Sequence, residues 1–281
     1  MPAPPPDARS FRSRVLEVRP AGPEGVVLRI DPGLEQPALR AARFFMLRRT
    51  DALSPQIPRP FSIYRQLDDG SLEFLIKVMG RGTQALAESP PGTELVTVGP
   101  LGHGWNTLDG DGDPWICVAG GIGSAPFYMG LQQAQAGMDG ATPVPADNLT
   151  FIYGAANADQ LYEREAFESL GVRTMCATDD GSHGFHGMVT DLLANLMDDA
   201  VVGKGETVFC CGPDPMMHAV ARMCDDRGLR CYLSLENYMA CGYGVCNGCT
   251  VEVQGERFEG WPYSKTCQQG PVYEAGELVD L

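Results

Sequence analysis

The stretch Cys241-Gly-Tyr-Gly-Val-Cys246-Asn-Gly-Cys249, followed after seventeen more residues by Cys267, organises the rest of the chain. Three cysteines at C-x4-C-x2-C spacing with a fourth downstream are typical of loops that hold a two-iron, two-sulfur cluster. Glycines separate the cysteines, and they allow the positive φ angles with which a loop curls around a small inorganic core. Backbone amides of such a loop can donate hydrogen bonds to the cluster sulfurs. The sequence therefore predicts a 2Fe-2S cluster held by Cys241, Cys246, Cys249 and Cys267.

A structural zinc site and a disulfide framework are the alternatives for this stretch. Zinc sites favour separate C-x2-4-C pairs, whereas here the two spacings share Cys246. Disulfide-dense domains are short, whereas this chain has ten cysteines in 281 residues. The spacing thus favours the cluster. Five other cysteines are interpreted as small residues of the hydrophobic core: Cys117, Cys176, Cys210, Cys224 and Cys231.

The length and composition limit the possible classes of protein. A chain of 281 residues with 44% hydrophobic residues can form two domains and a small appendage. Its net charge of −15 argues against nucleic acid or an anionic membrane as a partner. The N-terminus lacks the pattern of a signal peptide, and glycines and a proline interrupt the nearly uncharged run at 115–131, so no membrane span is expected. A reducing, cytoplasmic location suits the thiolates.

The N-terminal part is predicted to be a disordered segment, 1–10, followed by an antiparallel β barrel, 11–108. Short β-type runs alternate there with turns rich in Pro, Gly and Asp, as in small barrels. Two motifs in this part suggest ligand binding: Arg59-Pro-Phe-Ser62, and Gly82-Thr83 before a predicted helix. A threonine-capped helix start presents free amides to phosphate, although a plain helix cap is the alternative. Together the motifs could hold the ribityl and pyrophosphate arm of a dinucleotide.

Residues 109–230 alternate predicted strands and helices, which indicates a doubly wound parallel sheet. Ligands of such sheets bind beyond the carboxyl ends of the strands. Three loops lie there: Gly120–Ser124, Thr178–Gly181 and Gly212–Pro215. The first loop is not G-x-G-x-x-G, but its backbone can approach a pyrophosphate. The acidic run 109–113 is interpreted as a linker, His103 as an exposed turn residue, and residues 231–281 as a small cysteine-bearing module.

These motifs, in their order along the chain, resemble the ferredoxin-reductase superfamily of flavin and nicotinamide reductases. The resemblance rests on Arg59-Pro-Phe-Ser62 with Gly82-Thr83, on Gly120-Gly-Ile-Gly123, and on Cys211-Gly-Pro213 with Met216. The tail resembles, more specifically, the electron-transfer subunit of class-B dihydroorotate dehydrogenase. That likeness lies in Leu235-Glu236, in the stretch from Met239 to Cys249, and in the stretch from Cys267 to Tyr273.

The resemblance implies FAD on the barrel, NAD on the parallel sheet and a 2Fe-2S cluster on the C-terminal module. The residues implied for FAD are Arg59, Pro60, Phe61, Ser62, Leu75, Ile76, Lys77, Gly82 and Thr83. Those implied for the nicotinamide cofactor are Gly120, Gly121, Ile122, Gly123, Cys211, Gly212, Pro213 and Met216. Cys211 is expected either at the nicotinamide edge or as a small buried residue at a strand end. The carboxylate of Asp179 predicts the choice of cofactor. A carboxylate there accepts a hydrogen bond from a ribose 2′-hydroxyl and repels a 2′-phosphate, so NAD is favoured over NADP.

The resemblance also implies a partner, an FMN-containing dihydroorotate dehydrogenase catalytic subunit, in a heterotetramer with two copies of each. No acid–base pair is found, so no catalytic side chain is predicted, and the chain is expected to be inactive on dihydroorotate alone. Tyr238, Met239 and Tyr243 flank the cysteine loop and are candidates for the interface, with burial within the module as the alternative. The alternatives are the equivalent subunit of a ferredoxin-dependent transhydrogenase or a sulfide dehydrogenase, and, from another class, a zinc-bearing scaffold.

Overall fold

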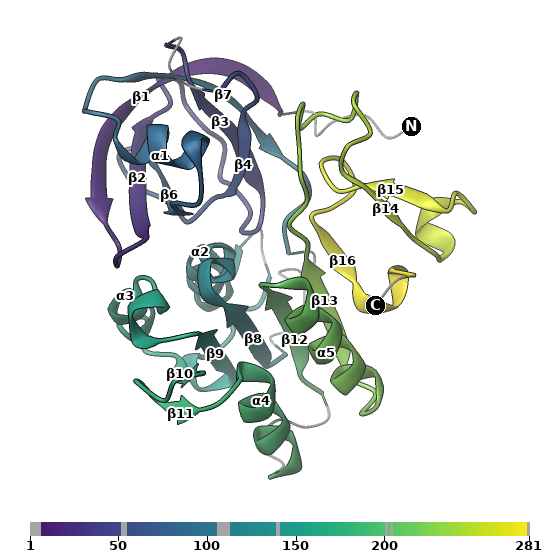
Figure 1. The fold of residues 1–281 in the computed structure, drawn as a ribbon. Coiled ribbons are helices and arrows are strands. Elements are labelled where there is room, and N and C mark those ends of the chain that lie inside the picture. The colour runs from purple at the N-terminus through teal and green to yellow at the C-terminus, as the bar shows by residue number, and fades with distance from the viewer. Residues whose placement is uncertain are drawn as a thin grey trace.

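The computed structural model describes residues 7–51, 55–105, 113–138, 141–199, 202 and 205–279. Within these residues the chain forms two seven-stranded sheets and a separate two-stranded hairpin (Figure 1). Residues 109–112 of the predicted acidic linker lie outside the described part of the chain.

The first sheet is antiparallel and corresponds to the predicted barrel (Figure 1). Its order is β4-β3-β7-β1-β2-β6-β5. Buried and half-exposed positions alternate along part of β2, as expected of a strand with one face on a core. Its elements are β1 (Arg9–Pro20), β2 (Gly25–Asp31), β3 (Phe44–Arg49), β4 (Arg59–Ser62), β5 (Arg65–Gln66), β6 (Leu72–Lys77), the helix α1 (Arg81–Ala87) and β7 (Glu94–Leu101).

The prediction that residues 1–10 are disordered is wrong for the four residues that the structure describes. Strand β1 begins at Arg9 and pairs with Gly99 of β7. Asp7 accepts two hydrogen bonds from the Arg43 guanidinium, at 2.7 and 2.9 Å. Hydrogen bonds of this bidentate kind hold the segment before β1 against the sheet.

The second sheet has the order β11-β10-β9-β8-β12-β13-β16, and all its strands except β16 are parallel. The chain runs outward from β8 to β11, then returns to β12 on the other side of β8. The order therefore reverses between β8 and β12, where doubly wound sheets bind their ligands. The elements are β8 (Trp115–Gly120), the 3-10 turn η2 (Gly121–Ser124), α2 (Ala125–Ala136), β9 (Leu149–Ala155), α3 (Arg164–Glu168), β10 (Arg173–Thr178), β11 (Phe185–His186), α4 (Val189–Asp198), β12 (Thr207–Cys211) and α5 (Asp214–Asp225).

The C-terminal module is joined to this second sheet. Strand β13 (Arg230–Ser234) pairs in parallel with β12, and β16 (Val272–Glu274) pairs antiparallel with β13. Between them lie the cysteine loop and the hairpin β14 (Thr250–Glu252) and β15 (Tyr263–Lys265). The expected module start at residue 231 therefore falls inside a strand of the parallel sheet.

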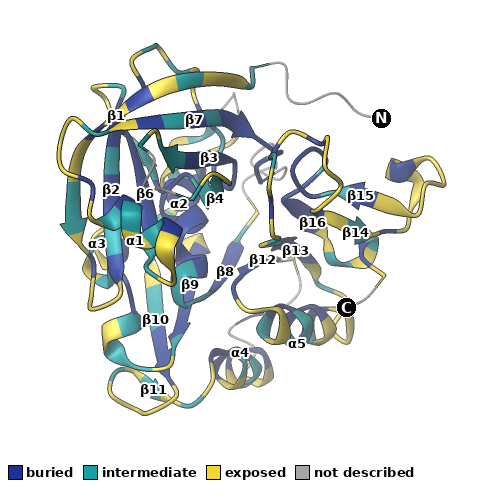
Figure 2. Ribbon diagram, turned by 45° about the horizontal axis from the view of Figure 1, so that its top comes forward, coloured by how far each residue is buried: buried dark blue, intermediate teal, exposed yellow. Residues whose placement is uncertain are grey.

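One hydrophobic core runs through the barrel and the parallel sheet. The central strands β8, β9 and β12 are almost completely buried (Figure 2). The Trp105 ring stacks on Phe127 of α2 at 5.4 Å and meets the edge of Phe209 of β12 at 5.2 Å. These aromatic contacts are part of the buried contact between the barrel and the parallel sheet. Among the described residues no helix is long and apolar enough to cross a membrane.

Candidate functional site

The four predicted cluster cysteines lie in two pairs. Cys241 is close to Cys246, and Cys249 is close to Cys267, so that each cysteine of a pair affects the ionisation of the other. Burial opposes ionisation of Cys241, but the backbone amides of Cys246 and Tyr243 outweigh it and lower the pKa of Cys241 to about 7. The neighbouring Cys267 lowers the pKa of Cys249 to about 6, while Cys249 and burial raise the pKa of Cys267. Cys241 and Cys249 therefore favour the thiolate, the form that binds metal.

This pairing fits a two-iron cluster better than a single zinc ion. Each iron of a 2Fe-2S cluster takes two cysteine sulfurs, whereas a zinc ion gathers four ligands around one point. Across the described residues, no three His, Cys, Asp or Glu side chains converge on a single metal position. All ten cysteines are free thiols, so the disulfide alternative is wrong.

Glycines let the cysteine loop fold tightly onto its surroundings. Gly242 has φ +79°, and a Cβ there would lie 2.4 Å from Cγ of Met46 on β3. Gly244 has φ +87°, and a Cβ there would lie 2.2 Å from the amide carbon of Gln268. The Lys265 ammonium donates to the Gly244 carbonyl at 2.6 Å. Sequence reasoning did not assign Gln268 or Lys265, because their contacts with the loop arise only in the fold.

The two barrel motifs come together in space. Arg59 lies on β4, and a Cβ on Gly82 would lie 2.3 Å from its Nε, so the Arg59 side chain packs directly on the Gly82 backbone. The prediction that Thr83 caps the helix is wrong. Helix α1 begins at Arg81 after Gly80, and the Thr83 hydroxyl, already in the first turn, accepts from the Met79 and Gly80 amides.

The third predicted flavin segment, Leu75 to Lys77, lies at the end of β6. Leu75 and Ile76 are buried, and Lys77 forms an ion pair with Glu24 at 3.5 Å. Strand β5 pairs with β6 only at Leu72 and Glu73. Among the described strands, the backbone of this segment is therefore unpaired on its β5 side, which leaves its polar groups for a ligand.

The two nicotinamide loops also meet, at the point where the strand order reverses. A Cβ on Gly123 would lie 2.4 Å from the Cys211 carbonyl oxygen. A Cβ on Gly120 would lie 2.7 Å from Sδ of Met216 and 2.8 Å from Pro213. Glycine is thus required for the close approach of the loops after β8 and β12. Two backbone segments are presented side by side, as pyrophosphate binding requires.

Asp179 and Asp180 have different surroundings after β10. Both are exposed, but the Asp180 carboxylate accepts the Ser182 amide at 2.9 Å. That hydrogen bond and the Ser182 hydroxyl lower the pKa of Asp180. The backbone amide of Asp179 donates to the Ala155 carbonyl at 3.1 Å, which does not involve the carboxylate. The Asp179 carboxylate is the better candidate for a ribose hydroxyl.

Cys211 lies beside two polar residues at the carboxyl ends of β12 and β13. Its thiol is buried beside Ser234, and burial and the charge of Glu236 raise its pKa. Glu236 itself is solvent-exposed. Sequence reasoning used Glu236 only as part of a motif, and the fold places it at the nicotinamide loops.

The residues that flank the cysteine loop divide into two groups. Tyr238 is 98% exposed and Tyr243 is 47% exposed, so both can contact a partner. Met239 is buried against Phe44 and Met46, and its predicted place in an interface is wrong. His103 is exposed as predicted, and its backbone amide donates to the Gly270 carbonyl at 2.6 Å. The predicted core cysteines are all buried: Cys117, Cys176, Cys210, Cys224 and Cys231.

Solved structures share this fold, and two of them are described as oxidoreductases or reductases. A structure described as an NADH-dependent reduced ferredoxin-NADP oxidoreductase, studied for flavin-based electron bifurcation, superposes with a TM-score of 0.78 at 23% identity, over 95% of this chain and 89% of that one. A ferredoxin NADP+ reductase from Neisseria gonorrhoeae superposes with a TM-score of 0.62 at 17% identity, over 78% of this chain and 92% of that one. These similarities establish the ferredoxin-reductase-like fold.

Sequence comparisons identify the family. Residues 117–222 match the oxidoreductase NAD-binding domain, and residues 236–279 match the iron-sulfur cluster binding domain of dihydroorotate dehydrogenase B. The dihydroorotate dehydrogenase B (NAD(+)) electron transfer subunit of Clostridium acetobutylicum is 34% identical over 86% of this chain and 87% of its own length. The electron transfer subunit of Geobacillus thermodenitrificans is 34% identical over 84% of this chain and 86% of its own length. The chain therefore belongs to the family of dihydroorotate dehydrogenase B electron transfer subunits.

Proposed function

We propose that this chain transfers electrons between an FMN-containing dihydroorotate dehydrogenase subunit and NAD, by way of a 2Fe-2S cluster and FAD. The named activity of its relatives, an NAD(+)-linked electron transfer subunit, supports this role in pyrimidine biosynthesis. Residues 11–108 hold FAD, residues 109–230 hold NAD, and residues 231–281 hold the cluster.

The observation that carries the proposal is the position of β3. On one edge, Met46 of β3 pairs with Pro60 of the flavin strand β4. The side chain of the same Met46 lies against Gly242 of the cysteine loop. The flavin strand and the cluster loop are thus separated by one strand and one layer of buried side chains. Such proximity is what electron transfer between two bound cofactors requires.

Bound FAD exchanges a hydride with the nicotinamide and single electrons with the cluster. The work of the chain is to bind and orient these groups. Arg59 and Gly82 would contact the phosphate part of FAD. Gly120 and Gly123 would bring backbone amides to the pyrophosphate of the nicotinamide cofactor. Asp179 accepts the ribose hydroxyl. Phe44 and Met46 form part of a buried cluster that excludes water between β3 and the cysteine loop.

The partner subunit oxidises dihydroorotate, a reaction for which this chain has no proposed site. Oxidation of dihydroorotate removes a proton from carbon, which needs a base, and no proposed site here provides one. The exposed side chains of Tyr238, Tyr243 and Val245 around the cysteine loop suit a contact with the FMN-containing subunit. We infer two copies of each subunit in the complex. Ten free thiols support a reducing compartment such as the cytoplasm.

Cys246→Ser tests the assignment. We expect the purified variant to keep FAD and NADH-dependent dye reduction, to lose iron and sulfide, and to pass no electrons from the FMN-containing subunit to NAD. Cys176→Ser, at a thiol outside the loop, should keep all of these properties. Stoichiometric zinc in the unaltered protein, or orotate formation by the isolated chain, would refute the proposal.

A further inference from the structure

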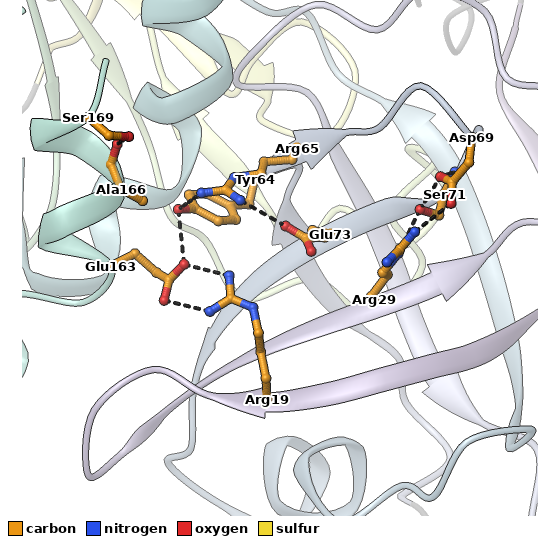
Figure 3. A network of polar contacts seen from close by, with 10 residues as sticks. All are labelled: Arg19, Arg29, Tyr64, Arg65, Asp69, Ser71, Glu73, Glu163, Ala166 and Ser169. Carbon is orange, nitrogen blue, oxygen red and sulfur yellow. Dashed lines mark hydrogen bonds and ion pairs between the residues drawn. The ribbon is translucent and has the colours of Figure 1, made fainter. Parts of the chain in front are cut away.

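A charged network joins the barrel to the nicotinamide domain on the edge of their shared core (Figure 3). Arg19, at the end of β1, donates to both carboxylate oxygens of Glu163 at 2.7 and 2.5 Å. Glu163 immediately precedes α3 and has φ +55°. Its side chain is only 12% exposed. The two residues are 144 positions apart in the chain, and the geometry is that of a bidentate charge-assisted pair.

Two consecutive residues extend the network into the barrel. The Tyr64 hydroxyl donates to Glu163 at 3.4 Å, and Arg65 donates to the Tyr64 oxygen at 3.0 Å. Arg65 also forms an ion pair with Glu73 of β6 at 3.6 Å. The guanidinium lies over two rings, 4.7 Å from the centre of Tyr64 and 4.0 Å from that of Tyr128 on α2. Arg65 therefore contacts both domains.

The network is continuous with both proposed cofactor sites. Tyr64 follows Ser62, the last residue of the flavin strand, by two positions. Tyr128 lies in the first turn of α2, directly after the glycine turn that ends at Ser124. Arg65, three residues after the flavin strand, thus contacts the helix that follows the glycine turn of the nicotinamide site.

Direct packing is incomplete beside this network. An open cavity of about 560 Å³ lies between the turn after β1 and residues 158–166, and Glu163 is part of its lining. Apolar contact is present at this edge, where a Cβ on Gly25 would lie 2.6 Å from the Tyr162 ring, but the cavity interrupts it. The polar pairs hold the two domains beside the cavity, and a partly buried charge that loses its partner is strongly unfavourable.

We propose that Arg19, Glu163 and Arg65 are positioning residues that fix the nicotinamide domain against the barrel for hydride transfer. The proposal rests on the function proposed above. Hydride transfer depends on the distance and angle between the two rings, and a misplacement of about 1 Å can lower a rate about 100-fold. Binding of each cofactor depends on its own domain, and so it tolerates a small change in the angle between domains.

Glu163→Gln and Arg19→Gln, alone and combined, test this role in the FAD-loaded protein. We expect stopped-flow flavin reduction by NADH to slow about 10- to 100-fold, and the flavin–nicotinamide charge-transfer absorbance to weaken. FAD content and the KM for NADH should stay within about twofold. The double variant should be no slower than the slower single variant, because both changes break one pair.

Hydrogen exchange of the FAD-loaded protein without NADH gives a readout independent of turnover. Residues 158–166 and the turn after β1 should exchange faster in Glu163→Gln. Asp69→Asn is the matched control, since it removes the Arg29–Asp69 ion pair, which lies wholly within the barrel (Figure 3). The rate of flavin reduction by NADH and the hydrogen exchange of Asp69→Asn should equal those of the unaltered protein.

Arg65→Met keeps an unbranched side chain but removes the guanidinium, and it tests the role separately if Glu163→Gln folds poorly. Unchanged flavin reduction and exchange in the folded variants would overturn the positioning role and leave the proposed function intact. If the unaltered protein takes up FAD but NADH does not reduce it, the proposed function fails instead.

Discussion

Gly242 lies directly against Met46, since a Cβ on this glycine would come within 2.4 Å of the methionine Cγ. Gly242 belongs to the cysteine loop, and Met46 belongs to the strand next to the flavin strand. A single close contact therefore sets how near the cluster loop comes to the flavin site.

Gly242→Ala should move the cysteine loop away from β3. The methyl group clashes with Met46, and the left-handed φ of +79° costs roughly 1–2 kcal/mol for alanine. We expect lower iron content and slower electron transfer between flavin and cluster, with FAD content unchanged. Gly276→Ala is the control, because nothing lies within 4 Å of that position. Equal iron content and rates in the two variants would contradict the prediction.

The exposed carboxylate of Asp179 should select NADH over NADPH. Asp179→Asn removes a charged hydrogen-bond acceptor and should raise the KM for NADH about tenfold. It should also reduce the discrimination against NADPH, because the repulsion of the 2′-phosphate is lost. Steady-state diaphorase kinetics measure both effects. Asp180→Asn, whose carboxylate already accepts from Ser182, should change neither value by more than about twofold.

Tyr243→Asp should weaken binding of the FMN-containing subunit at least about tenfold, because a charge replaces an exposed aromatic ring beside the cluster. Titration calorimetry or a pull-down with the purified partner measures the loss, while NADH-dependent dye reduction continues. Tyr263→Asp is a matched control on β15, since Tyr263 is 49% exposed and Tyr243 is 47% exposed. Equal loss of affinity in both variants would mean that the interface is not centred on the cysteine loop.

The ion pair between Asp7 and Arg43 should make stability depend on pH. The hydrogen bond and charge of Arg43 outweigh the effect of burial and lower the pKa of Asp7. A lowered pKa in the folded state stabilises the protein above the unfolded pKa, near 3.8, and the contribution disappears as the pH falls through the folded value. Asp7→Asn should therefore destabilise the protein by about 1 kcal/mol at pH 7, seen as a lower Tm, and the difference from the unaltered protein should shrink as the pH falls below 3.8. A pH-independent difference would contradict this.

Local patterns explain what the sequence could predict. The cysteine spacing, the alternation of strands and helices after Trp115, and the turn at Gly120 depend on neighbours in the chain. The fold class and the presence of an iron-sulfur binding domain could therefore be predicted from them. Thr83 was predicted to precede the helix, but α1 begins at Arg81, two residues before Thr83. The difference between a cap and a first-turn residue depends on backbone angles that the sequence does not display.

Long-range contacts explain what the sequence could not predict. Arg59 meets Gly82, and Arg19 meets Glu163, only after distant segments fold together. The sequence around Arg59 and around Arg19 contains no pattern that identifies the residue each one contacts. Met239 shows the same limit, since an apolar residue beside a cysteine loop can face a partner or the core, and here it packs on Phe44 and Met46.

The pairing of β16 with β13 has a consequence for engineering this protein. The chain leaves the parallel sheet after Ser234, forms the cluster module, and returns to the same sheet at Val272. The module is therefore an insertion with two ends anchored in one sheet, and it cannot be exchanged between proteins as a cassette cut at residue 231. A chimera must keep both strands from one parent and replace only the chain between them.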